Sequence, residues 1–148
     1  MGKKRVVCAG TFDHFHLGHA DFLKQARALG DELIVIVARD ENVRRIKNIL
    51  PEHNENERRE SVEKTDIPDK VTLGYTDKDI FKILEDLKPD IIALGYDQRV
   101  SEDKLKERLP KCKIVRLKPF KPDKYKSSYY RAKTRFKRAR PPKAGEPF

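Results

Sequence analysis

The chain has 148 residues and a formal net charge of +10, and charged residues make up 39% of it. A chain of this length folds as one domain, and none of its apolar runs approaches the roughly 18 residues that a membrane-spanning helix needs. Two cysteines, Cys8 and Cys112, are too few for a disulfide framework, so we expect a single soluble domain in the reducing cytoplasm.

Short apolar segments alternate with helical patterns along the chain. The apolar run from Glu32 to Ala38 is continuous, which is typical of a strand buried on both faces of a parallel sheet. The predicted strands cover 5–9, 32–38, 70–73, 90–94 and 113–117. The predicted helices run from the turn after the first strand to about Leu29 with Gly30 as C-cap, from Arg39-Asp40-Glu41 to about Lys47, over 55–64, over 78–87 capped by Asp77, over 101–109, and from Tyr129 onward.

This alternation predicts an α/β fold, namely a Rossmann-like, doubly wound parallel sheet of five strands with helices on both faces. In such sheets, ligands bind beyond the carboxyl ends of the strands, where the strand order reverses. Polar residues that a core does not require follow three of the predicted strands: Thr11, His16, His19, Arg39, Asp40 and Asp97. The sequence therefore predicts a binding site at this edge of the sheet.

The segment from Val7 to Ala20 joins the first strand to the first helix. A strand that turns into a helix directs backbone N–H groups and the positive end of the helix dipole to one place, which suits a phosphate. His16 and His19 lie on the same side of the first helical turn, and Gly18 between them lets a ligand approach the backbone. We interpret this corner as a phosphate site with imidazole donors.

Two other interpretations of these histidines are open. They can be polar residues near a surface turn, or His14, His16 and His19 can form a zinc site. Zinc on a helix favours histidines four residues apart, and no cysteine or paired carboxylate stands nearby to close such a site. The favoured interpretation therefore assigns no metal-binding residue to the chain.

The positive charge is concentrated near the C-terminus. Residues 1–110 hold 20 Lys and Arg against 22 Asp and Glu, whereas residues 111–148 hold 14 against 2. Such a segment can bind nucleic acid, focus anionic substrates toward a cleft, or simply keep the protein in solution. We predict a domain over 1–133 and a flexible basic tail over 134–148, and for the tail we favour the solvated state.

The sequence lacks the motifs that usually supply a nucleophile for covalent catalysis. The sequence has no G-x-S-x-G elbow, no Walker P-loop and no close Cys/His pair, so no nucleophile is evident. The predicted site offers hydrogen-bond donors and positive charge instead. Transfer of a phosphoryl or nucleotidyl group needs little else, because the reactants must only be held in line while charge builds on the phosphate oxygens.

The pattern G-T-F-D-x-x-H-x-G-H from Gly10 to His19 resembles the signature of the cytidylyltransferase-like nucleotidyltransferases. Within that superfamily, Gly30 to Glu41, Lys88 to Gln98 and the spacing from Lys113–Arg116 to Ser127 resemble the archaeal FAD synthases. The resemblance covers roughly residues 4 to 130. It implies an enzyme that transfers AMP from ATP to FMN, giving FAD and pyrophosphate with a divalent cation, expected to be Mg²⁺.

The resemblance also implies roles for individual residues. His16, His19 and Lys47 are the predicted catalytic residues, which contact the triphosphate and the charge that develops on it. The other residues predicted to bind the nucleotide are Gly10, Thr11, Phe12, Gly18, Arg58, Asp97, Ser127 and Ser128. Asp97 matches a residue that contacts the nucleotide sugar or base, and the two serines match a helix start that closes on the triphosphate.

Alternatives to this function are also open. The runner-up is a cytidylyltransferase that uses CTP and a small phosphorylated alcohol such as glycerol 3-phosphate, because base choice rests on a few backbone contacts. The least favoured is a nucleic-acid-binding protein on the same fold. The resemblance adds a homodimer as an expectation, and no membrane partner is predicted.

Overall fold

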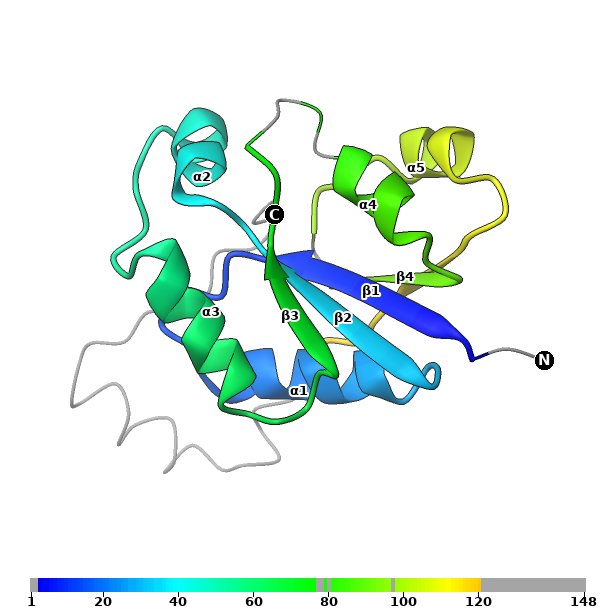
Figure 1. The fold of residues 1–148 in the computed structure, drawn as a ribbon, viewed down its shortest axis with the longest axis horizontal. Coiled ribbons are helices and arrows are strands. Elements are labelled where there is room, and N and C mark those ends of the chain that lie inside the picture. Colours follow the sequence, from blue (N-terminus) through cyan, green and yellow to red (C-terminus); the bar gives the residue numbers. More distant parts are fainter. Residues whose placement is uncertain (1–2, 77–78, 80, 97, 121–148) are drawn as a thin grey trace.

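A computed structural model describes residues 3–76, 79, 81–96 and 98–120 of the chain. Its centre is a parallel sheet of five strands in the order β3-β2-β1-β4-β5 (Figure 1). The strands are β1 (Arg5–Gly10), β2 (Glu32–Val37), β3 (Lys70–Leu73), β4 (Ile91–Leu94) and β5 (Lys113–Arg116). Each lies within one residue of its predicted bounds.

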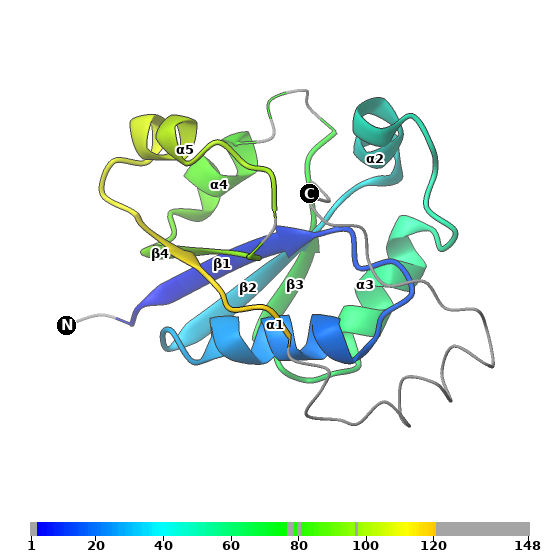
Figure 2. The ribbon, with the colours of Figure 1, turned by 180° about the vertical axis from the view of Figure 1, so that it is seen from behind.

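Helices cover both faces of the sheet. The helices are α1 (Leu17–Arg27), α2 (Asp40–Lys47), α3 (Glu55–Glu63), α4 (Lys82–Leu87) and α5 (Glu102–Arg108). Figures 1 and 2 show α1 and α3 on one face and α4 and α5 on the other, with α2 leading away from the end of β2. The predicted doubly wound α/β fold is confirmed.

Alternate residues of the central strands build two separate cores. On one face, Val6 and Cys8 pack with Leu23 of α1 and Val62 of α3. On the other face, a second cluster joins the strands to α4 and α5, and its members include Val7, Ile34, Leu84 and Leu105. Burial on both faces explains the uninterrupted apolar sequence of these strands.

The strand order reverses between β1 and β4, which pair through Val6 with Ile91 and Val7 with Ile92. The amide side chain of Gln98 bridges their carboxyl ends, since it accepts from the Gly95 N–H at 2.7 Å and donates to the Ala9 carbonyl at 3.0 Å. The segment after β1 therefore begins at the switch point, where a doubly wound sheet binds its ligands.

Two predicted helix boundaries are wrong. The first helix ends at Arg27 with Ala28 as its C-cap, and Gly30 has another role. A Cβ at Gly30 would lie 2.8 Å from the Lys4 carbonyl, so glycine allows two chain segments to approach closely. Helix α4 begins at Lys82 rather than at residue 78. Asp77, its predicted cap, lies outside the described residues.

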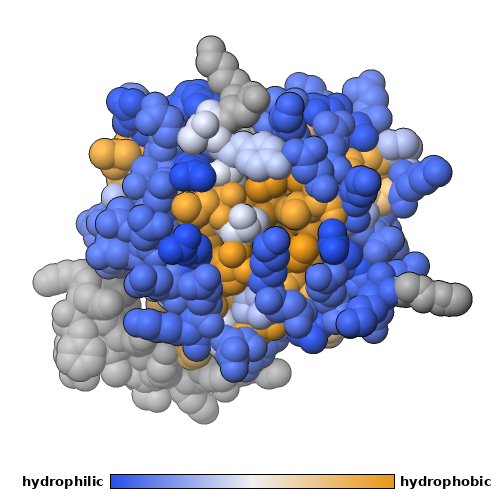
Figure 3. Space-filling model, in the orientation of Figure 1, coloured by the Kyte–Doolittle hydropathy of each residue, from blue (hydrophilic) through white to orange (hydrophobic). Residues whose placement is uncertain are grey.

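Both cysteines are buried and form no disulfide, as the sequence predicts. Burial raises the pKa of the Cys8 thiol far above its ordinary value and that of Cys112 to about 11. In the described part of the chain, no helix is both long and apolar enough to cross a membrane. Figure 3 shows one face of the molecule as mainly hydrophilic, with an apolar area near its centre. The predicted helix from Tyr129 and the basic tail lie outside the described residues.

Candidate active site at the corner between β1 and α1

The corner between β1 and α1 is a tightly packed turn. Thr11 and Phe12 are buried, and the Phe12 ring belongs to the core beneath the sheet. Phe12 adopts a φ of 56°, a left-handed conformation that few non-glycine residues take. A Cβ at Gly10 would lie 3.0 Å from the Phe12 ring, so glycine leaves room for this packing. The backbone predicted to contact a phosphate is thus held by the core.

His16 and His19 form the start of α1 between them. His16 is the N-cap, and its Nδ1 accepts the Gly18 N–H at 2.9 Å. His19 Nδ1 accepts the His16 N–H at 3.2 Å, which completes a reciprocal capping box. The two rings stack with their centroids 4.0 Å apart. The sequence prediction that both imidazoles share one side of the first turn is confirmed.

These two hydrogen bonds fix the tautomer of both rings. A nitrogen that accepts an N–H carries no hydrogen, so in the neutral form each ring carries its hydrogen on Nε2. Because the Nδ1 atoms accept from the backbone, the hydrogens that the two neutral rings can donate are on Nε2. The first turn of α1 itself contains no acidic residue that would offset the positive end of the helix dipole.

The electrostatics of His19 favour the neutral ring. Burial, followed by the nearby His16 ring, lowers the pKa of His19 to about 3, against an opposing effect of Asp13. Phe12 and Phe15 surround the ring, with centroids 5.5 and 5.2 Å away. A neutral imidazole at physiological pH can donate a hydrogen bond to an oxyanion without giving up a proton.

Gly18 has a local structural function in addition to the predicted one. The His16 imidazole lies beside it, and its predicted contact with a ligand stays a prediction. A Cβ at this position would lie 2.8 Å from Cε1 of His16 and 3.1 Å from its Nδ1. Glycine is therefore needed for the ring to fold over the helix start.

Arg58 lies beneath the corner rather than over it. Its side chain is 0% exposed, although the sequence placed it over the phosphates. Nη1 donates to the Thr11 carbonyl at 2.9 Å, Nη2 to Oδ1 of Asp40 at 2.6 Å, and Nε to the His53 carbonyl at 2.9 Å. All three nitrogen atoms are thus used inside the protein. The geometry makes Arg58 a residue that holds the start of α3 against the segment after β1.

The remaining predicted residues are only partly described. Lys47 is half-buried at the last position of α2, where Asn48 ends the helix in a left-handed conformation. Asp97, Ser127 and Ser128 lie outside the described residues, so their predicted roles stay predictions.

The structure does not assemble the alternative zinc site. Among the described residues, His14 groups with Asp13 and His53, and not with His16 and His19, as a set of side chains that could hold a metal ion. His53 comes from the loop before α3 and was not among the predicted site residues. Sequence reasoning missed it because 39 positions separate it from His14 and no local motif marks it.

A family model described as cytidylyltransferase-like matches residues 7–133, and the chain belongs to that family. Two curated relatives are each named FAD synthase. The one from Methanosarcina barkeri is 52% identical over 76% of this chain and 82% of its own length. The one from Archaeoglobus profundus is 50% identical over 84% of this chain and 81% of its own.

One solved structure combines sequence and structural similarity. The lipopolysaccharide core biosynthesis protein from Thermoplasma volcanium has a TM-score of 0.75 and 40% identity. The match covers 81% of this chain and all of that one. The signature corner therefore lies within a fold that is shared over most of the chain.

Proposed function

We propose that the protein is an FMN adenylyltransferase, which transfers AMP from ATP to FMN and releases FAD and pyrophosphate. The observation that carries this is the identity of about half of all aligned residues with proteins named FAD synthase, over four fifths of both chains. The paired imidazole donors at the start of α1 supply the chemistry that such a transfer needs.

The triphosphate of ATP binds at the first turn of α1, with its α-phosphate near the backbone of Gly10, Thr11 and Phe12. A phosphate oxygen of FMN attacks the α-phosphorus of ATP and forms a new P–O bond. The bond between the α-phosphorus and the oxygen that bridges it to the β-phosphorus breaks on the opposite side. Pyrophosphate leaves with the electron pair of that bond. Little covalent chemistry falls to the protein, so positioning and charge stabilisation supply the rate.

His16 and His19 stabilise the charge that builds on the phosphate oxygens. Their Nε2–H groups are preorganised because both Nδ1 atoms are bonded to the backbone. Neutral His19 acts as a hydrogen-bond donor and not as a general acid. Lys47 adds positive charge near the leaving pyrophosphate, and Asp97, Ser127 and Ser128 contact the nucleotide.

A divalent cation accompanies the triphosphate, and we infer that it is Mg²⁺. This ion prefers oxygen ligands and is usually held by one or two carboxylates together with substrate phosphates. No residue of the chain is assigned to this ion, so phosphate oxygens and water would supply its ligands. When bound, the cation neutralises charge on the phosphates.

A cytoplasmic location and a homodimer stay predictions. The first rests on cysteine usage and the second on the family resemblance. Sedimentation velocity of the purified chain tests the second, with a dimer as the expected species.

Pyrophosphate release tests the function directly. The purified chain is incubated with Mg²⁺ and either ATP plus FMN or CTP plus glycerol 3-phosphate, and FAD is identified by chromatography. We expect pyrophosphate and FAD in equal amounts from the first pair and a background rate from the second. Pyrophosphate release only from the pair of CTP and glycerol 3-phosphate would make the protein a cytidylyltransferase. Release from neither pair, together with salt-sensitive RNA binding, would contradict the proposal as a whole.

A further inference from the structure

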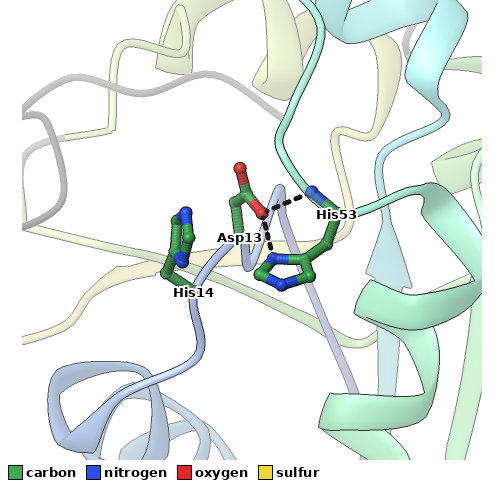
Figure 4. Close-up of side chains that lie close together, drawn as sticks. All are labelled: Asp13, His14 and His53. Atoms are coloured by element: carbon green, nitrogen blue, oxygen red, sulfur yellow. Dashed lines mark hydrogen bonds and ion pairs between the residues drawn. The ribbon is translucent and has the colours of Figure 1, made fainter. Parts of the chain in front are cut away.

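Beside the phosphate corner, the side chains of Asp13, His14 and His53 converge from two loops (Figure 4). Each offers one oxygen or nitrogen atom, and these three atoms lie within 4.8 Å of one another. Asp13 and His14 belong to the segment after β1, whereas His53 belongs to the loop before α3. The fold thus joins residues that lie 39 and 40 positions apart in the sequence.

The carboxylate of Asp13 is fixed by main-chain donors. Oδ2 accepts the Glu52 N–H at 2.9 Å, and Oδ1 accepts the His53 N–H at 3.1 Å and the His53 ring nitrogen Nδ1 at 3.0 Å. These hydrogen bonds hold the Asp13 carboxylate in place as a prepositioned oxygen ligand.

The two imidazoles are open to solvent while the carboxylate is sheltered. The exposed fraction is 53% for the His14 side chain and 46% for that of His53, against 19% for Asp13. His14 has a φ of 52°, a left-handed backbone conformation that few non-glycine residues adopt. The rings meet edge-on with centroids 4.8 Å apart.

A second carboxylate stands beside this group. Oε1 of Glu52 lies 2.5 Å from Nε2 of His14. Carboxylates that hydrogen-bond to a histidine orient the ring and make it a stronger metal ligand. The two imidazole nitrogens and the Asp13 carboxylate, with the Glu52 carboxylate beside His14, form a set of ligands that suits Zn²⁺ and related ions. Mg²⁺, in contrast, prefers oxygen ligands alone.

We propose that Asp13, His14 and His53 form a binding site for a divalent transition-metal ion of the Zn²⁺ class, separate from the triphosphate site. Bonds of about 2.1 Å require ligand atoms closer together than 4.8 Å, and rotation of the exposed His14 side chain closes that gap. Water completes the coordination on the solvent side. The bound ion links the signature corner to the loop before α3 and stabilises the folded chain.

The site does not compete with the proposed catalytic residues for protein ligands. His16 and His19 have their Nδ1 atoms committed to the start of α1, and neither belongs to the group that brings three donor atoms together. Metal binding here is therefore a property of the nucleotide-free protein, and it can be measured without any reaction.

The test is calorimetric titration of the untagged, EDTA-treated full chain with ZnCl₂ in the absence of nucleotide. We expect one Zn²⁺ per chain, an increase in Tm on binding, and no heat from MgCl₂ at the same concentration. His14→Gln and His53→Gln should each weaken binding by about tenfold or more. His16→Gln and His19→Gln are the matched controls and should leave the Zn²⁺ affinity unchanged.

The variants also decide the location of the site. Unchanged Zn²⁺ affinity in both His14→Gln and His53→Gln would overturn the proposal, as would loss of binding in His16→Gln or His19→Gln. Both side chains at the proposed site are about half exposed, so the two variants are expected to fold. Far-UV circular dichroism checks this, and if one of them is unfolded, the other alone decides.

Discussion

The amide hydrogen of Gly18 points at Nδ1 of His16, with 2.9 Å between the nitrogen atoms. This one contact joins the two functions of the corner. It caps α1, and it places the hydrogen of the neutral His16 ring on Nε2, from which a phosphate oxygen can accept a hydrogen bond. The same contact explains why residue 18 carries no side chain, since a Cβ would lie 2.8 Å from the ring.

Replacing Gly18 with alanine should therefore act on catalysis through His16. The new methyl group displaces the imidazole from the helix start, and a shift of about 1 Å in a catalytic group can lower turnover by about a hundredfold. Steady-state kinetics with ATP and FMN measure kcat. Gly74→Ala is the matched control, because the nearest atom to a Cβ there is 3.5 Å away and kcat should stay near normal. Equal kcat in the two variants would contradict this role.

Removal of either imidazole should lower turnover with the fold intact. His16→Ala and His19→Ala each remove a donor to the developing negative charge, for which a loss of about a hundredfold or more is expected. His16→Ala also removes the helix cap and costs about 1 kcal/mol of stability. Single-turnover rates of FAD formation and thermal unfolding separate the two effects. Near-normal rates in both variants would rule out the assigned role.

Arg58 should matter first for stability. Arg58→Met removes a buried donor to the partly exposed Asp40 carboxylate and to two carbonyls, and the loss of these hydrogen bonds should cost about 2–3 kcal/mol. Urea denaturation measures the loss. Arg44→Met is the control, since its pair with Glu41 lies on the surface with both side chains 58% exposed, and the expected cost is below about 1 kcal/mol. A similar small cost for Arg58→Met would show that the buried network is not needed.

The lowered pKa of His19 predicts a dependence of stability on pH. The pKa is 6.5 for an ordinary histidine and about 3 in the folded chain, so between these values the unfolded chain takes up a proton that the folded chain does not. The contribution of His19 is therefore fully present above pH 6.5 and is lost as the pH falls toward 3.

Comparison with His19→Gln isolates this contribution. The difference in free energy of unfolding between the native chain and the variant should be smaller at pH 5 than at pH 7.5, by about 1–2 kcal/mol. Urea denaturation at both pH values measures it. An identical difference at the two values would show that the His19 pKa is not lowered on folding.

Local sequence patterns predict the sheet and the histidine pair because both depend on nearby residues. The run from Leu33 to Ala38 is apolar because β2 is covered on both faces, and His16 and His19 meet because one helical turn places them together. The helix end near Gly30 was mispredicted for the opposite reason. That glycine responds to the carbonyl of Lys4, a contact distant in sequence.

The same distinction separates the predicted from the missed parts of the site. Arg58 has the charge that a phosphate site needs, but its burial under Thr11 depends on how α3 packs against the corner. His53 reaches Asp13 only because the loop before α3 returns to the end of β1. Contacts of this kind are set by tertiary packing, and a single sequence carries no local signal for them.

The central claim is that the first turn of α1 binds the triphosphate through hydrogen bonds from the two imidazoles. A crystal structure of the protein with FMN and a non-hydrolysable ATP analogue tests it most directly. We predict phosphate oxygens within hydrogen-bond distance of Nε2 of both His16 and His19, with the FMN phosphate in line with the α-phosphorus. An analogue bound elsewhere, with this corner filled by solvent, would contradict it.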